Sequence, residues 1–219
     1  MDYRLVIGDK AISSWSLRPW LAMTHCGLAF REIGIRLFRP DTRAEILRYS
    51  PSGRVPALLI GDDQVVWESL AILEYLAEAH PEAHLWPLAA TPRALARSLA
   101  AEMHAGFEAL RAHCPMDLLA HTPMAAVPDP VAADVRRIIA LWRRCRAGFA
   151  GEGPMLFGAF CAADAMYAPV ATRFRTYLPD LRPYGDDGTA QAYVDAILAL
   201  PAMVAWRQAA DSEPSPPPG

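Results

Sequence analysis

The chain has 219 residues, of which 53% are hydrophobic and 21% charged, and its formal net charge is −3. This composition is typical of a compact soluble protein with one large domain or two small ones. The acidic balance provides no electrostatic footprint for nucleic acid, and no apolar run reaches the length of a transmembrane helix. We therefore expect no nucleic-acid or membrane partner, and the run from Met1 does not read as a signal peptide.

Thiols and imidazoles are scattered along the chain rather than paired. No Cys-x-x-Cys pair occurs, so we expect reduced, mostly buried thiols in a cytoplasmic protein. The histidines lack the short paired spacings of a metal site, so we expect no metal. The residues concerned are Cys26, Cys114, Cys145, Cys161, His104, His113 and His121.

The first elements alternate between strand and helix. The apolar run 5–7 predicts a strand, and residues 17–28 then follow helical spacing, with Gly27 just past the helix end. Pro19 is expected in the first turn of that helix, where its missing N–H costs nothing. Alternation over 32–37 predicts a half-buried strand, and Asp41 can begin a short helix that ends near residue 48.

A hairpin and a helix follow the loop Arg54-Val55-Pro56. The run 57–60 predicts a buried strand and 64–67 its returning partner, with Ser69 as the N-cap of the next helix. Proline cannot donate to a ladder, and a cis Val55-Pro56 bond explains its position best. The backbone of Val55 would then be free to pair with an extended peptide, and the N–H groups at Glu68-Ser69 suit a carboxylate. Such a site favours a small peptide with an acidic end.

This pattern, a Val-Pro pair followed about a dozen residues later by Glu-Ser at a helix start, resembles the thioredoxin-like domain of the cytosolic glutathione transferases. The order β-α-β-α-β-β-α of the expected elements is the thioredoxin-like order. The resemblance implies that the loop Arg54-Val55-Pro56 pairs with the cysteinyl backbone of glutathione. It also implies that Glu68 and Ser69 hold the γ-glutamyl carboxylate and amine.

The composition changes after residue 80, where prolines interrupt the chain and an alanine-rich, helical part follows. We expect a thioredoxin-like domain over 1–82, a linker over 83–91 and an all-helical domain over 92–211. Helices are expected from Ala162 to Tyr177, with a kink at Pro169, and from Pro201 onward. The Pro- and Ser-rich tail 212–219 is expected to be disordered. A thioredoxin-like domain followed by a helical bundle again resembles the glutathione transferases.

Three serines, Ser13, Ser14 and Ser16, lie where the first strand leads into the first helix. Glutathione chemistry needs a thiolate, but a free thiol has a pKa near ~8.5 and is mostly protonated at neutral pH. A hydroxyl that donates to sulfur near the positive end of a helix stabilises the anion. Lowering the pKa by about two units takes roughly 2.7 kcal/mol, which one charge-assisted hydrogen bond and the dipole can supply.

The motif Ser-Ser-x-Ser-x-Arg at these positions resembles that of the zeta class, in which the first serine activates the thiol. The resemblance implies this role for Ser13, with Ser14 as the alternative, because related serine-type classes differ in which serine points at sulfur. Plain helix capping is the competing interpretation of both serines. The beta class uses a cysteine here, and this chain has none before Cys26.

The sequence gives the weakest indication for the pocket that would bind the second substrate. In the family it lies between the domains, and Trp15, Met103, Phe107 and Arg111 are the candidates, the last three because their spacing puts them on one helix face. Core packing competes as the interpretation of Met103 and Phe107. Arg111 would suit an acidic substrate, although an exposed surface arginine is the more conservative interpretation.

One departure from the family pattern concerns the helix start near Asp164. Family members usually have Ser or Thr three residues earlier, whereas this chain has Cys161, a weaker hydrogen-bonding residue.

The resemblance implies a homodimeric glutathione transferase, of the kind used in detoxification, that adds glutathione to a small electrophile. The alternatives are a glutathione-dependent cis-trans isomerase of the maleylacetoacetate kind and a non-catalytic binding module.

Overall fold

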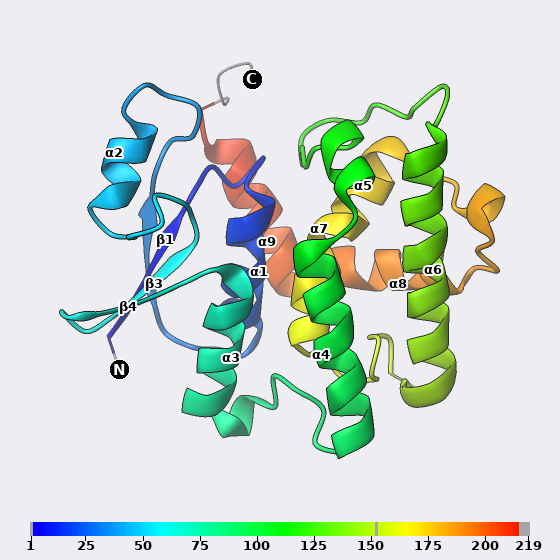
Figure 1. Ribbon diagram of the computed structural model, residues 1–219, viewed down its shortest axis with the longest axis horizontal. Helices are drawn as coiled ribbons and strands as arrows, with labels where there is room; N and C mark the ends of the chain where they lie inside the picture. Colours follow the sequence, from blue (N-terminus) through cyan, green and yellow to red (C-terminus); the bar gives the residue numbers. More distant parts are fainter. Residues whose placement is uncertain (1, 152, 215–219) are drawn as a thin grey trace. The chain divides into compact units, whose positions relative to one another are not determined.

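The computed structural model describes residues 2–151 and 153–214. They fall into two compact units. The first comprises the residues up to Ala83 together with the segment that begins at Pro201, and the second is His84–Leu200 (Figure 1).

The first unit contains a four-stranded sheet with the strand order β2-β1-β3-β4. β1 pairs with β2 in parallel, and β3 pairs antiparallel with both β1 and β4. The expected β-α-β-α-β-β-α order and the thioredoxin-like fold class are therefore confirmed. The elements are β1 (Tyr3–Ile7), α1 (Ser14–His25), β2 (Arg31–Gly34), α2 (Thr42–Leu47), β3 (Ala57–Ile60), β4 (Gln64–Trp67), α3 (Ser69–Ala79) and the short η1 (Pro81–Ala83).

Helices cover both faces of this sheet (Figure 1). Val6 and Ala57 share a buried cluster with Ile46 of α2. Leu5 and Leu58, one residue along each strand, point to the opposite face because strand side chains alternate. They are fully buried, and α1 and α3 contact the sheet there. The hydrophobic alternation of the strands thus makes the sheet the core of the first unit.

Three local expectations in this unit are corrected. α1 begins at Ser14, so Pro19 lies inside the helix rather than in its first turn. The early start follows from a tight turn, in which the N–H of Ser13 donates to the carbonyl of Asp9 at 2.8 Å. β2 ends at Gly34, although the N–H of Ile35 still donates to the carbonyl of Ile7. At α3, Glu68 is the N-cap and Ser69 is the first helical residue.

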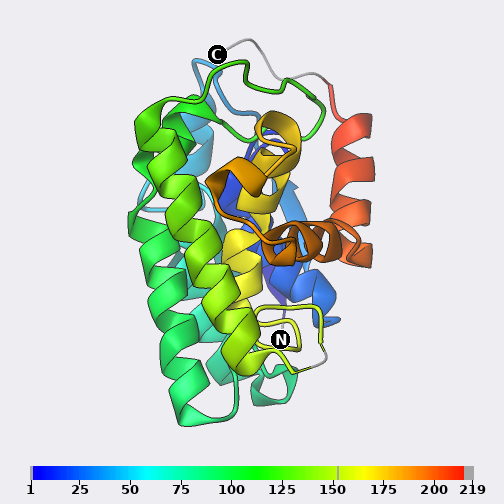
Figure 2. The same ribbon diagram turned by 90° about the vertical axis from the view of Figure 1, so that its right-hand side faces the viewer.

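The second unit is all-helical, as expected. α7 packs against α4 and α8 (Figure 2), and it runs through Pro169 without ending. Trp142 of α6 contacts the rings of Tyr167, Phe174 and Tyr193. The elements are α4 (Ala90–Ala105), α5 (Glu108–His113), α6 (Asp129–Phe149), α7 (Ala162–Tyr177), η2 (Arg182–Tyr184) and α8 (Thr189–Leu198).

The last helix, α9 (Pro201–Ser212), starts at the expected residue but belongs to the first unit. It packs on α1, where the ring centroids of Trp20 and Trp206 lie 4.8 Å apart. The expected helical domain 92–211 was therefore too long at its end. The expectation of disorder from residue 212 is also wrong at its start, because Ser212 is helical and Glu213 is hydrogen-bonded. Residues 215–219 lie outside the described residues.

The start of α7 shows how the chain accommodates Cys161. Cys161 is the N-cap in extended conformation, and it forms a capping box with Asp164. The Asp164 carboxylate accepts from the N–H of Cys161 at 2.8 Å, the N–H of Leu156 at 3.1 Å and the hydroxyl of Tyr193 at 2.9 Å. The helix start that the sequence put in question is thus held chiefly by the aspartate.

All four cysteines are free, Cys26 half-buried and the other three buried. Within residues 2–151 and 153–214, no three His, Cys, Asp or Glu side chains are grouped as a metal site would need. Over the same ranges no helix alone has the length and apolar character to cross a membrane, and one bent pair, Thr189–Leu198 with Pro201–Ser212, meets that test by length and composition only.

Candidate active site at one end of the sheet

Strand register gathers the predicted binding segments at one end of the sheet. Val6, Ala57 and Trp67 form one row across β1, β3 and β4. β1 and β4 leave the sheet just beyond this row, and β3 enters there because it runs antiparallel to both. The loop to Ser13, the Val55-Pro56 pair and Glu68-Ser69 therefore lie at the same end. No single local pattern fixes this arrangement, which comes from the pairing of three strands.

The Val55-Pro56 peptide bond is cis, as expected. Pro56 is buried and Val55 half-buried, with its side chain against the cluster that contains Ala57. Val55 precedes the first paired residue of β3 by two positions, so its backbone groups lie outside the ladder. The side chain of Arg54 is exposed, while its N–H donates to the hydroxyl of Ser52 at 3.2 Å. The loop thus presents a fixed main chain.

The start of α3 combines a strained backbone with a buried hydroxyl. Glu68 has φ 70° and ψ 128°, a conformation that costs a non-glycine residue about 1–3 kcal/mol. Its carbonyl accepts the N–H of Ile72 at 3.0 Å, so the helix begins immediately after it. Ser69 is fully buried, and its Oγ has no hydrogen-bond partner among the described residues. The first turn of α3 contains no acidic residue, so its N–H groups favour an anion.

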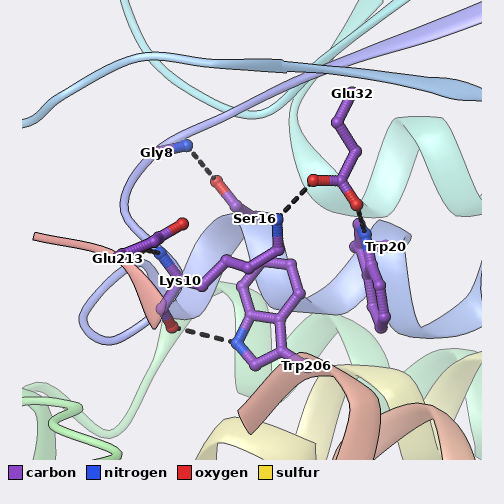
Figure 3. A network of polar contacts seen from close by, with 7 residues as sticks. All are labelled: Gly8, Lys10, Ser16, Trp20, Glu32, Trp206 and Glu213. Atoms are coloured by element: carbon purple, nitrogen blue, oxygen red, sulfur yellow. Dashed lines mark hydrogen bonds and ion pairs between the residues drawn. The ribbon is translucent and has the colours of Figure 1, made fainter. Parts of the chain in front are cut away.

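The predicted serines occupy the start of α1, and their hydroxyls differ. Ser13 is the N-cap, and its hydroxyl donates to the Oγ of Ser16 at 2.7 Å. Ser16 in turn accepts the N–H of Gly8 at 3.0 Å (Figure 3). Ser14 is the first helical residue, and its hydroxyl makes no hydrogen bond within the part of the chain that the structure describes. The Ser13 hydroxyl is therefore already hydrogen-bonded, whereas the Ser14 hydroxyl can still donate to a ligand.

Two features of α1 favour a negative charge at its start. The first turn of α1 contains no acidic residue that would offset the helix dipole. Arg18 is buried one turn after Ser14, with its guanidinium carbon 4.1 Å from the ring centroid of Trp15. A helix N-terminus and a nearby cation both favour the ionised form of an acid that binds there. The start of α1 can therefore stabilise a thiolate.

The residues expected to line the second pocket do not lie on the one helix face that the sequence predicted. α4 ends at Ala105, and Phe107 adopts a left-handed conformation with φ 60°, so Met103, Phe107 and Arg111 do not share one helix. Met103 is fully buried in the helical unit. Arg111 is half-buried and donates to the carbonyls of Met103 and His104, which end α4. It is therefore neither an exposed surface arginine nor part of a continuous helix face.

Sequence reasoning missed the residues that hold the loop before Ser13. The carbonyl of Asp9 accepts the N–H groups of Ile12 and Ser13 at 3.2 and 2.8 Å. Its carboxylate lies 2.6 Å from Arg36 and accepts the N–H of Leu37 at 2.6 Å. The sequence signal was a plain Gly-Asp turn, which indicates a loop but not the partners of its side chains.

Comparison with known proteins gives relatives of one kind. The family model of the glutathione S-transferase N-terminal domain matches residues 12–79. A maleylacetoacetate isomerase from Rhizobium meliloti (strain 1021) is 33% identical over 174 residues, which cover 75% of this chain and 76% of the relative. A probable maleylacetoacetate isomerase from Caenorhabditis elegans is 32% identical over 101 residues, and the match spans only 46% of either protein. A zeta-class glutathione S-transferase from Euphorbia esula is 38% identical over 76 residues, 34% of this chain and 33% of the relative.

Solved structures share the fold over nearly the whole chain. A glutathione transferase from Methylococcus capsulatus has a TM-score of 0.69 and 25% identity, covering 96% of this chain and 100% of the other. A glutathione transferase homolog from Burkholderia GL BGR1, solved with bound glutathione, has a TM-score of 0.72 and 23% identity, covering 97% and 100%.

Proposed function

Because the chain belongs to the cytosolic glutathione transferase family, in its zeta-like branch, we propose that it binds glutathione as a thiolate and adds it to a small electrophile. The thiol proton leaves to solvent before the attack. The sulfur lone pair then forms the new bond to the electrophilic carbon, and the displaced π electrons take up a proton from solvent or the displaced pair departs with a leaving group. Glutathione is then a co-substrate, and the protein supplies its position and the stabilisation of its charge.

The buried Oγ of Ser69 is the observation that carries this proposal. A buried hydroxyl without a partner costs roughly 1–3 kcal/mol, so such a group is retained where a ligand can bond it. It lies at the start of a helix with no acidic residue in its first turn, a setting that suits the γ-glutamyl carboxylate. Glu68 would hold the γ-glutamyl amine, and the Val55 backbone would pair with the cysteinyl residue beside Pro56 and Arg54.

Two hydroxyls can stabilise the sulfur anion. Ser14 can donate directly, because its hydroxyl makes no other hydrogen bond within the described chain. Ser13 donates to Ser16 in the structure, so Ser13 can donate to sulfur only after this hydrogen bond reverses and the Ser16 hydroxyl donates to Ser13. The second arrangement makes a chain from the Gly8 N–H through Ser16 and Ser13 to sulfur, and each bond polarises the next.

Titration of the thiolate absorbance of the enzyme–glutathione complex tests the proposal. We expect the wild-type protein to hold the thiol ionised at neutral pH, and removal of the donor hydroxyl to raise the thiol pKa by about one to two units. Turnover at neutral pH should then fall roughly three- to twenty-five-fold and recover in part as the pH rises.

Three matched variants assign the donor. A shift in Ser13→Ala together with a smaller shift in Ser16→Ala indicates the Ser16–Ser13 chain. A shift confined to Ser14→Ala assigns the role to Ser14. If neither Ser13→Ala nor Ser14→Ala moves the thiol pKa, the serine mechanism is wrong. A wild-type protein that is not retained on immobilised glutathione would refute the proposed function itself.

A second candidate function is cis-trans isomerisation, favoured by the relative that covers three quarters of this chain and is named a maleylacetoacetate isomerase. The thiolate would add to a conjugated double bond and push the π electrons onto the carbonyl oxygen. Rotation about the resulting single bond and expulsion of the thiolate would give the trans isomer, with no net use of glutathione. Maleylacetone in an electrophile panel separates the two functions: isomerisation leaves the total free thiol constant, whereas conjugation depletes it.

The active form is proposed to be a cytoplasmic homodimer, because this assembly is usual in the family. Light scattering at micromolar concentration should give a mass near twice that of the 24.0 kDa chain. A monomer under these conditions would contradict the assembly but would leave the proposed chemistry open to the titration above. A protein that binds glutathione but neither ionises its thiol nor turns over any electrophile would instead be a binding module.

A further inference from the structure

The C-terminal segment holds both backbone groups of one residue in the loop before the serines. The indole N–H of Trp206 donates to the carbonyl of Lys10 at 2.9 Å, and the N–H of Lys10 donates to Oε2 of Glu213 at 2.8 Å (Figure 3). α9 and this loop belong to the same compact unit. Lys10 is thus fixed from one side by residues about two hundred positions later in the sequence.

The surroundings of these contacts are buried and charged. Lys10 is 8% exposed, and its ammonium pairs with Glu32 and lies 5.3 Å from the ring centroid of Trp206. Glu32 also accepts the indole N–H of Trp20 at 2.6 Å. Burial raises the pKa of Glu213, while the Lys10 N–H and the Lys10 charge act in the opposite direction. Partial burial weakens competition from water, so the Glu213 carboxylate is a strong acceptor for this N–H.

A second contact joins the same segment to the other side of the loop. The guanidinium of Arg36 donates to the carbonyl of Pro214 at 2.7 Å and lies 2.6 Å from the Asp9 carboxylate. The carbonyl of Asp9 accepts the N–H of Ser13, as described above. The loop is therefore held at Asp9 and Lys10, the two residues from which the turn to Ser13 and Ser14 starts.

We propose that Glu213 and Trp206 are positioning residues for the thiol-activating serines, acting through the backbone of Lys10. This inference rests on the proposed function, because it concerns the geometry of the same site. Packing of Trp206 on Trp20 would be enough to attach α9 to α1. The polar contacts also fix the loop itself, since they hold the carbonyl and the N–H of Lys10, three positions before Ser13. A small change in hydroxyl direction weakens a hydrogen bond steeply, so the site depends on this fixation.

Three variants of the C-terminal segment test the proposal. Glu213→Ala removes the acceptor, and Glu213→Gln keeps an acceptor oxygen without the charge. Asp211→Ala removes an exposed carboxylate from the end of α9, two residues before Glu213, and serves as the control. In Glu213→Ala we expect the pKa of bound glutathione to rise by about 0.5–1 unit, which lowers turnover at neutral pH about 1.5- to threefold through the smaller thiolate fraction. Glutathione affinity should change less than about twofold, because the groups that bind it lie elsewhere.

Hydrogen exchange of the unliganded protein gives an independent measurement. The amides from Lys10 to Ser13 should exchange about tenfold faster in Glu213→Ala than in the wild type. Glu213→Gln should restore most of both properties, and Asp211→Ala should match the wild type. Trp206→Phe keeps a ring against Trp20 but removes the N–H to Lys10, so it should shift the thiol pKa in the same direction.

The outcomes separate this inference from the proposed function. A lower melting temperature in Glu213→Ala with an unchanged thiol pKa and unchanged exchange at Lys10–Ser13 would show a merely structural role and overturn the inference. A Gln variant as impaired as the Ala variant would overturn the assignment of Glu213 as acceptor. If the wild-type protein fails to ionise glutathione, the proposed function is wrong, and Glu213 and Trp206 then have no role in thiol activation. In that case the hydrogen-exchange experiment alone decides whether the C-terminal segment holds the loop.

Discussion

The starts of α3 and α7 each bury a polar side chain completely, and in the part of the chain that the structure describes only the α7 start provides it with hydrogen-bond partners. Asp164 at the start of α7 is 0% exposed and accepts three hydrogen bonds. Ser69 at the start of α3 is also 0% exposed, yet its Oγ has no partner among the described residues. The α7 start follows an extended N-cap, whereas the α3 start follows Glu68 in a strained conformation.

The difference separates a helix start that is complete in itself from one that we propose glutathione completes. A satisfied buried group holds its helix in place and leaves nothing for a ligand. An unsatisfied group next to backbone strain is destabilising on its own, so its persistence points to a ligand that completes it. Burial alone would have given the two residues the same interpretation. The list of hydrogen-bond partners distinguishes them, and mutation at each start should have opposite consequences.

The largest effect is expected for Asp164→Ala. Removing the carboxylate leaves the Leu156 N–H, the Cys161 N–H and the Tyr193 hydroxyl without their acceptor in a buried site. We expect the free energy of unfolding to fall by about 3–5 kcal/mol. Urea unfolding followed by circular dichroism measures this loss. A drop below about 1 kcal/mol would show that other groups hold the α7 start.

Ser69→Ala should behave in the opposite way. The variant removes an unsatisfied hydroxyl, so the free energy of unfolding should stay constant or rise slightly. Glutathione affinity should weaken by about 1–3 kcal/mol, because the carboxylate loses a donor. Turnover at saturating glutathione should suffer less, since this contact is made equally in the ground and transition states.

Glu68→Ala is the companion variant, and calorimetry with urea unfolding measures affinity and stability for both. It should weaken glutathione by a similar amount through the γ-glutamyl amine. A Ser69→Ala protein with lower stability and unchanged affinity would reverse the comparison between the two helix starts. Loss of turnover with an unchanged Michaelis constant would also contradict the assigned binding roles.

Cys161→Ser sharpens the comparison at the satisfied start. A hydroxyl is a better acceptor than a thiol for the N–H groups of the first turn, so the variant should stabilise the protein by up to ~1 kcal/mol. The thiol is 3% exposed, and its packing opposes this gain. The denaturation midpoint measures the balance, and an unchanged or lower midpoint would show that packing outweighs capping here.

The smallest effect concerns Cys145, whose pKa is raised to about 12 by burial, with the charge of Asp164 acting in the same direction. Its folded pKa exceeds the ordinary value of 9.0, so its contribution to stability is complete below pH 9.0 and is lost as the pH rises through about 12. Between pH 7 and 9.5 the loss should be about 0.8 kcal/mol.

Cys145→Ala isolates this contribution, because the variant lacks the titrating thiol. Urea unfolding at the two pH values should give a smaller decrease for Cys145→Ala than for the wild type. Equal decreases in the two proteins would show that the folded thiol ionises near its ordinary pKa.

Local patterns predicted much of the first unit. The limits of β3 and β4, and those of α7 in the second unit, follow from short apolar runs and the punctuation around them. The cis Val55-Pro56 bond follows from a proline next to a strand. The predicted binding segments lie at one end of the sheet, because strand pairing brings together the end of β1, the start of β3 and the end of β4.

Features that depend on distant partners were beyond the sequence. The break before Phe107 requires a helix end that Arg111 completes by reaching back to the carbonyls of Met103 and His104. The engagement of the Ser13 hydroxyl by Ser16 depends on rotamers, which helical spacing does not specify. α8 was missed altogether. α9 was assigned to the wrong unit, because the apolar residues of α9 indicate a helix but not the surface that the helix covers.

The return of α9 to the first unit also has a consequence for how the chain folds. Trp206 and Lys10 are 196 positions apart, so their hydrogen bond closes a very long loop. Contacts of such separation form late, since their loop entropy must be overcome before they contribute. On the ribosome, the strands and helices up to Ala83 emerge before residues 84–200, and the helix that completes their unit emerges after those residues. The helical residues 84–200 can therefore fold as a continuous segment before the unit that begins the chain is closed.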